Sequence, residues 1–131
     1  MCNMTNGEAI TASDLLQTLA DKSMSASAAL AIRRVLRELH SHLVSVEAER
    51  NAIVDRHVAH DENGEMIPDG KVKGRYLLKE GHGPLLDEEM KALFAAPCVV
   101  MHPIKATELA GLPPVTPDFL LGLGAVVDDE C

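Results

Sequence analysis

Aromatic side chains are almost missing from this chain. Its 131 residues include no tryptophan, one tyrosine and two phenylalanines. Hydrophobic residues nevertheless make up 47% of the sequence, so any core must be aliphatic. A chain of this length buries roughly two-thirds of the surface that its unfolded form exposes. We therefore expect residues 1–131 to form a single domain with a core of Leu, Val, Ile, Ala and Met.

Long apolar runs and an excess of basic residues are also missing. No stretch reaches transmembrane length, and residues 1–20 have no basic segment followed by an apolar core, so we expect neither membrane insertion nor a signal peptide. Acidic residues outnumber basic ones by 20 to 12, for a formal net charge of −8. This balance argues against binding to nucleic acid or to an anionic membrane surface, because both require positive charge.

Cysteine is scarce and has no metal-binding spacing. The three cysteines, Cys2, Cys98 and Cys131, cannot all pair within one chain, and a reduced, intracellular setting fits them best. Cys98 lies in an apolar run and is expected to be a small buried residue. Cys2 and Cys131 are expected at loose chain ends, residues 1–8 and 128–131, where they can crosslink in vitro.

One long amphipathic helix is predicted over about residues 25–60. Apolar positions recur there with alternating spacings of four and three, which is a heptad pattern typical of a coiled coil. We call the positions with this spacing the seam, in which Arg50 and His57 are the two polar members: Ile32, Leu36, Leu39, Leu43, Val46, Arg50, Ile53 and His57. At roughly 1.5 Å per residue the helix would be about 50 Å long. A compact domain of this size is only about 30 Å across, so we expect the helix to extend beyond its own domain or to be covered by another chain.

Two interpretations of the seam remain open. It is either the buried face of an ordinary core helix or an interface between copies of the chain. Val35, Val54 and Val58 widen the apolar stripe, which favours packing against more than one neighbour. Arg50 needs a carboxylate such as that of Glu47, from its own chain or from a partner. Our working prediction is a homo-oligomer that forms through the seam.

Shorter elements complete a predominantly α, α+β fold. Helices are predicted from Ser13 to about Asp21, from Leu85 to Ala96, and from Thr116-Pro117-Asp118 onward, where a cap, a proline and an acid open the helix. Short strands at 9–12, 98–101 and 104–106 are predicted to form one small sheet. The first and third of these strands share an Ile-x-Ala-(Ser/Thr)-(Asp/Glu)-Leu pattern with the residues that follow them. Residues 61–74 are rich in turn formers and expected to be flexible, and residues 71–80 form either a returning helix or a loop.

The order of these features resembles a known family. Ser13-Asp14-Leu15 leads into a leucine-rich helix that carries Glu47-Ala48-Glu49-Arg50 and is followed by Asp61–Glu65. A short apolar strand, Ile104–Leu109 and the capped segment at Thr116 come after Leu85. From about Glu8 to Val127 this layout resembles a family of short, uncharacterised bacteriophage proteins, a domain of unknown function. The resemblance implies a phage or prophage origin and a place in the host bacterial cytoplasm or in the phage particle. It brings no catalytic residues to carry over.

No group of residues predicts catalysis, a metal site or a cofactor. His57, His60 and Asp61 could share one side of the helix, but they lie at a helix end where solvation is the default. Cys98 and His102 are close in sequence, yet a strand between two prolines is a poor place for an activated thiol. We therefore expect a protein that is not an enzyme.

Arg33, Arg34 and Arg37 form a candidate basic patch on the long helix. Arg34 has Glu38 as a potential partner one helical turn away. The patch is a solvated face, a docking site for an acidic partner, or a site for phosphate or nucleotide. Together these features predict a non-enzymatic phage protein that acts through protein–protein interaction, self-associates through the long helix and serves particle structure or assembly. The alternative is a small phage inhibitor of a host defence protein or of its signalling ligand.

Overall fold

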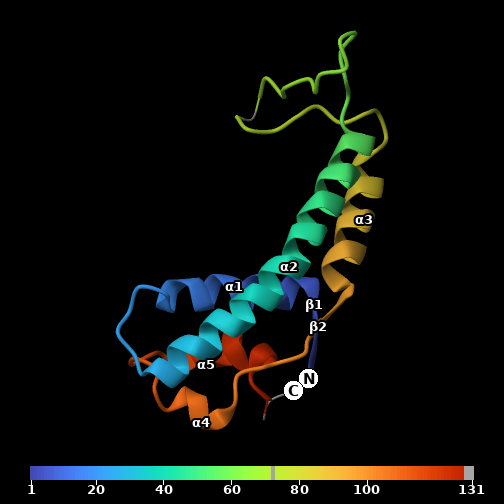
Figure 1. Ribbon diagram of the computed structural model, residues 1–131. Coiled ribbons are helices and arrows are strands. Elements are labelled where there is room, and N and C mark those ends of the chain that lie inside the picture. Colours follow the sequence, from blue (N-terminus) through green and yellow to red (C-terminus); the bar gives the residue numbers. More distant parts are fainter. Residues whose placement is uncertain (72, 129–131) are drawn as a thin grey trace. The chain divides into compact units, whose positions relative to one another are not determined.

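The computed structural model describes residues 1–71 and 73–128, and these residues divide into two compact units (Figure 1). Unit 1 comprises Met1–Ser45 and the chain from Ala95 onward, and unit 2 comprises Val46–Phe94. Most residues are helical and one small sheet is present, so the predicted fold class is confirmed. The predicted long helix is α2, Ala26–His57. It begins in unit 1 and ends in unit 2.

The sheet of unit 1 has two antiparallel strands. β1, Cys2–Thr5, pairs with β2, Pro97–Val100, so that Cys2 lies opposite Val100 and Thr5 lies opposite Pro97. Alternate residues of both strands are buried, and one face of the sheet therefore contributes to the core. The strand predicted at 98–101 is confirmed with its bounds shifted by one residue. Cys2, which we expected at a loose end, is fully buried.

Helix α1, Asn6–Leu19, occupies the place where a strand at 9–12 was predicted. The Oγ1 of Thr5 accepts a hydrogen bond from the Glu8 backbone N–H at 3.1 Å, and the Glu8 Oε1 accepts one from the Thr5 N–H at 3.1 Å. This reciprocal cap starts the helix well before Ser13, which is buried inside it. The strand prediction was wrong because Ala9 and Ala12 recur with helical spacing. The matching Ile-x-Ala patterns are therefore not a structural repeat.

The C-terminal part of unit 1 contains two short helices, α4 at Ala106–Leu109 and α5 at Pro117–Leu123, and the 3-10 turn η1 at Gly124–Val126. The strand predicted at 104–106 is reduced to one bridge between Ile104 and Val127, because Ala106 already begins α4. The predicted start of the last helix is confirmed, since the Thr116 Oγ1 accepts a hydrogen bond from the Phe119 N–H at 3.2 Å.

The core of unit 1 collects aliphatic side chains from α1, α2, the sheet and the C-terminal turn. From the seam, Ile32 and Leu39 belong to this core, and Leu36 and Leu43 pack against it. The first half of the seam is therefore covered by the chain's own elements. This matches the first of the two interpretations left open by the sequence.

Unit 2 pairs the last turns of α2 with α3, Gly83–Ala95, close to the predicted helix at 85–96. Arg56 and Glu89 join the two helices through an ion pair of 2.8 Å, and Figure 1 shows α3 beside this part of α2. Val46, Ile53 and His57 of the seam are buried here, as is Val58. α3 has no buried residue, so unit 2 has a thinner core than unit 1.

A ring of backbone hydrogen bonds follows α2 in unit 2. The Ala59 N–H donates to the Leu77 carbonyl at 2.8 Å, the Leu77 N–H donates to the Ile67 carbonyl at 2.8 Å, and the Ile67 N–H donates to the Ala59 carbonyl at 3.0 Å. We call residues 57–61, 65–69 and 75–79 the three segments of this backbone ring. Residues 71–80 therefore do not form the returning helix, although Val72 lies outside the described residues.

Turn chemistry connects the segments of the ring. The Asp61 Oδ1 accepts hydrogen bonds from the N–H groups of Asn63 at 2.8 Å and Glu65 at 3.0 Å. Gly64 adopts a positive φ of 80°, a conformation that glycine reaches without strain. The turn formers at 61–64 thus close a hairpin between the first two segments, as their sequence favours.

Candidate functional site

A groove of about 790 Å³ lies in unit 1 between α1, the connection from α1 to α2, and the first turns of α2. We call it the basic groove. Its lining residues are Ser13, Gln17, Ala20, Lys22, Ser23, Met24, Ala29, Ile32, Arg33, Leu36, Arg37 and His40. Its volume falls in the range of sites that hold ligands or partner side chains.

The floor of the basic groove is apolar. Ile32 is buried in the core of unit 1, and Leu36 and Met24 are half-buried and pack against that core. All three also line the groove. Ala20 and Ala29 are exposed and short, which leaves room above them. This combination offers an apolar surface to whatever enters the groove.

The rim of the basic groove is positive. Arg33, Arg37 and His40 follow one another at positions i, i+4 and i+7 of α2, which places them in one row along the helix, and Lys22 comes from the connection. All four are exposed. None of the lining residues is acidic. Arg33, Arg37 and Lys22 make no ion pair with any residue in the described parts of the chain.

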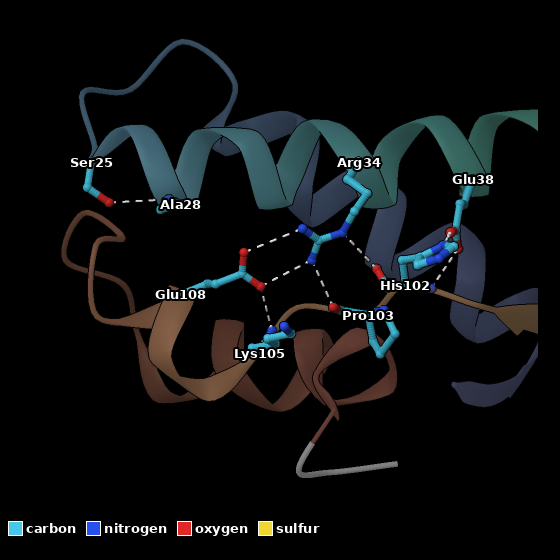
Figure 2. A network of polar contacts seen from close by, with 8 residues as sticks. All are labelled: Ser25, Ala28, Arg34, Glu38, His102, Pro103, Lys105 and Glu108. Atoms are coloured by element: carbon cyan, nitrogen blue, oxygen red, sulfur yellow. Dashed lines mark hydrogen bonds and ion pairs between the residues drawn. The ribbon is translucent and has the colours of Figure 1, made fainter.

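Arg34 does not join this row, although the sequence grouped it with its neighbours. Its Nε donates to the His102 carbonyl at 3.1 Å and its Nη2 donates to the Pro103 carbonyl at 2.9 Å (Figure 2). Its guanidinium also binds Glu108, with Nη2 3.1 Å from Oε1. This hydrogen bond, followed by one from the Lys105 backbone, holds the pKa of Glu108 below its usual range.

The predicted pairing of Arg34 with Glu38 was wrong. Glu38 binds the turn after β2 instead, because its Oε2 accepts the Met101 N–H at 2.8 Å and its Oε1 lies 2.6 Å from the His102 Nδ1. Partial burial raises the pKa of Glu38, but the hydrogen bonds from His102 and Met101 outweigh it, and the net shift is downward. Arg34 and Glu38 thus fasten the same turn to α2 from two positions of the helix.

His57 and His60, which the sequence analysis considered together with Asp61 as metal ligands, bind different partners. The His57 Nδ1 lies 2.9 Å from the His82 Nδ1, and its Nε2 lies 3.0 Å from the Glu89 Oε2. His60 turns to Asp55, at 2.9 Å. Hydrogen bonds from Arg56 and then from His57 lower the pKa of Glu89. In the ranges 1–71 and 73–128 no three His, Cys, Asp or Glu side chains are grouped so that they could hold a metal ion.

Cys98 and His102 do not form a reactive pair. Cys98 is 2% exposed, and burial, followed by the negative charge of Glu38, raises the pKa of its thiol. A thiol under these conditions stays protonated and is a poor nucleophile. The His102 ring is engaged by Glu38.

Arg50, one of the two polar residues of the seam, pairs with a residue of its own helix. The Arg50 Nη1 lies 3.3 Å from the Glu47 Oε1 on the same helix. Leu39, Ile53 and His57 are buried inside their own units. The seam therefore has little free surface of its own, and self-association through it stays a prediction.

No protein-family model, curated protein or solved structure matches the chain. Within the described residues, no helix has both the length and the apolar character needed to cross a membrane.

The basic patch predicted from the sequence contains two of the four basic side chains that line the groove. They are Arg33 and Arg37, and a helical projection would have added His40 and removed Arg34, which lies about 100° around the helix from Arg33. Lys22 carried no signal, because its place depends on how α1 connects to α2. The two predicted arginines that remain free in the described structure are those that line the groove.

Proposed function

We propose that this chain is a non-enzymatic bacteriophage protein that acts through protein–protein interaction, with the basic groove as its docking surface. One observation carries the proposal. Arg33 and Arg37 stand unpaired over the apolar floor formed by Ile32 and Leu36, in a protein whose net charge is −8. Arginines that have no partner within the fold are free to bind the carboxylates that another protein brings, and such complementary charges speed and orient association.

The resemblance to phage proteins supports a partner from the phage or from its bacterial host. A partner from the phage fits a role in particle structure or assembly. A host partner fits the alternative role, the inhibition of a defence protein. Self-association is a third outcome, in which the groove or the seam meets a second copy of the chain.

A photo-crosslinker placed in the groove tests this proposal. Gln17 is exposed on the α1 wall, and Leu30 is 64% exposed on α2 but does not line the groove. In host cells we expect an adduct from a crosslinking residue at Gln17 and none from one at Leu30. The adduct should disappear in the double variant Arg33→Glu/Arg37→Glu, and its mass identifies the partner as a second copy or another protein.

Equal adducts from both positions, or adducts that persist in the double variant, would contradict a docking role for the groove. Molar mass by light scattering, under reducing conditions and across dilution, decides separately whether the chain self-associates. A stable dimer that survives the double variant would direct attention back to the seam.

A second candidate function rests on the same cations. Guanidinium groups also bind phosphate, so the signalling ligand of a defence system is a possible occupant in place of a protein. Isothermal titration with ATP, as a representative nucleotide, tests this reading. Heat of binding that Arg33→Glu abolishes would favour it over a protein partner.

A further inference from the structure

We propose that the occupant of the basic groove is an amphipathic α-helix of another protein, with an apolar stripe that is bordered by acidic residues on one side. This inference rests on the proposed function and names the class of partner. It follows from the shape of the groove and from the unequal character of its two walls.

Two walls of the groove are helices, and the apolar residues that α2 contributes to its floor run from Ala29 through Ile32 to Leu36. At about 1.5 Å per residue this distance is roughly 10 Å, or two helical turns. An apolar strip of that length between two helical walls is the surface on which an amphipathic helix docks. The strip would take aliphatic side chains spaced one turn apart, over Ile32 and Leu36.

The two walls differ in charge. The α2 wall presents the row Arg33, Arg37 and His40, with one basic side chain for each turn of the helix. The α1 wall presents Ser13, Gln17 and Ala20, which carry no charge, and Gln17 and Ser13 are joined by a hydrogen bond of 3.4 Å. A partner helix therefore meets carboxylate-binding groups on one side only. Acidic residues at i, i+4 and i+7 of the partner would match the basic row.

Lys22 adds a fourth basic side chain where the connection between α1 and α2 closes one end of the groove. The C-terminal end of a helix carries a partial negative charge. The partner helix is therefore expected to point its C-terminus towards Lys22. The direction of the bound helix can be tested separately from its affinity.

A designed peptide of about 14 residues provides the probe. Leucines occupy one face, glutamates border this face on one side, and alanine and glutamine fill the remaining positions. A twin peptide carries lysines in place of the glutamates. With fluorescent labels on both, anisotropy against the full-length protein should show saturable binding of the glutamate peptide and none of the lysine twin.

Variants then locate the binding. Arg33→Glu/Arg37→Glu should weaken the glutamate peptide at least about tenfold, whereas Arg50→Glu/Arg75→Glu changes the net charge equally outside the groove and should alter the affinity by less than about twofold. Ala29 is exposed, so Ala29→Trp should fold normally and block the floor. A spin label at Ser23 should broaden the NMR signals of the C-terminal residues of the peptide more than those of its N-terminal residues.

Three results would overturn the proposal. Equal binding of the two peptides would mean that the apolar floor acts without the basic row. Equal weakening by the two double variants would mean that the net charge acts without the groove. Absence of peptide binding, while the Gln17 adduct still forms, would remove the acidic helix and leave the proposed function standing. If neither the Gln17 adduct nor peptide binding is seen, both the helical partner and the docking role of the groove are contradicted.

Discussion

Arg34 and Glu108 join α2 to α4 through a two-point contact, with Nη2 3.1 Å from Oε1 and Nη1 3.4 Å from Oε2. The same guanidinium donates to two backbone carbonyls of the turn that precedes α4. Arg33, one position earlier, makes no such contact and faces the basic groove. Two adjacent arginines on one helix thus have separate tasks, one within the fold and one on the surface.

The first prediction separates these two tasks. Arg34→Ala should lower the free energy of unfolding by about 1–2 kcal/mol, because it leaves two carbonyls without their donor and removes the ion pair with Glu108, while part of the site stays solvent-screened. Arg33→Ala should change it by less than about 0.5 kcal/mol. Urea unfolding followed by circular dichroism measures both. An equal loss for the two variants would contradict the division.

The second prediction concerns acid. The pKa values of Glu38 and Glu108 are lowered in the folded chain, so the unfolded chain binds protons first as pH falls. Their contribution to stability is complete above the ordinary carboxyl pKa and is lost as pH drops through the lowered values. The free energy of unfolding should therefore decline between roughly pH 5 and pH 3.

Glu108→Gln serves as the control for this decline. The variant should be less stable at pH 7 and should lose less stability on acidification, because the amide does not titrate. Thermal unfolding at a series of pH values measures both effects. A variant whose pH profile runs parallel to that of the original chain would show that Glu108 plays no part.

The third prediction tests whether the first half of the seam is core. Leu39 is fully buried, and Leu30 on the same helix is 64% exposed. Leu39→Ala should cost about 2–5 kcal/mol of unfolding free energy, because it leaves a cavity, whereas Leu30→Ala should cost less than about 0.5 kcal/mol. Calorimetry and light scattering together decide the question. A Leu39 variant that changes its oligomeric state without losing stability would point instead to an interface.

The fourth prediction concerns a close approach at the start of α2. A Cβ built on Gly111 overlaps the Ser25 Oγ and comes within 3.2 Å of the Ala28 Cβ. Ser25 caps α2, since its Oγ accepts the Ala28 N–H at 3.2 Å (Figure 2). Gly111→Ala should therefore displace the cap and cost roughly 1–3 kcal/mol.

Gly70 is the matched position for that test, because a Cβ built there meets nothing within 4 Å. Gly70→Ala should leave the melting temperature of the chain unchanged within error. Differential scanning fluorimetry of the two variants, side by side, measures the contrast. Similar losses at both glycines would show that close packing at Ser25 is not the cause.

Local signals explain which parts of the fold the sequence could predict. α2 was predicted because apolar residues recur along it with alternating spacings of four and three. The start of α5 was predicted because Thr116 is a capping residue and Pro117 follows it directly. The sequence could not reveal β1, since its partner β2 follows only after the whole of unit 2 in the sequence. α1 was missed in part because Ile10 between two alanines fits a strand as well as a helix.

The candidate site followed the same rule. Arg33 and Arg37 share a helix face and could be predicted to act together. A helical projection separates Arg34 from that set, but its partners in the turn at His102–Pro103 could not be predicted from the helix. Lys22 entered the groove through the tertiary arrangement of α1 and α2 within unit 1.

The backbone ring of unit 2 has a consequence for how the protein behaves at high concentration. A strand at the edge of an open sheet offers a row of vacant donors and acceptors, to which strands of other molecules add. At the centre of the ring lie Ala59, Ile67 and Leu77. The N–H and the C=O of each of these residues form hydrogen bonds with the other two. The three segments thus close on one another and leave no strand edge at these positions for fibre growth.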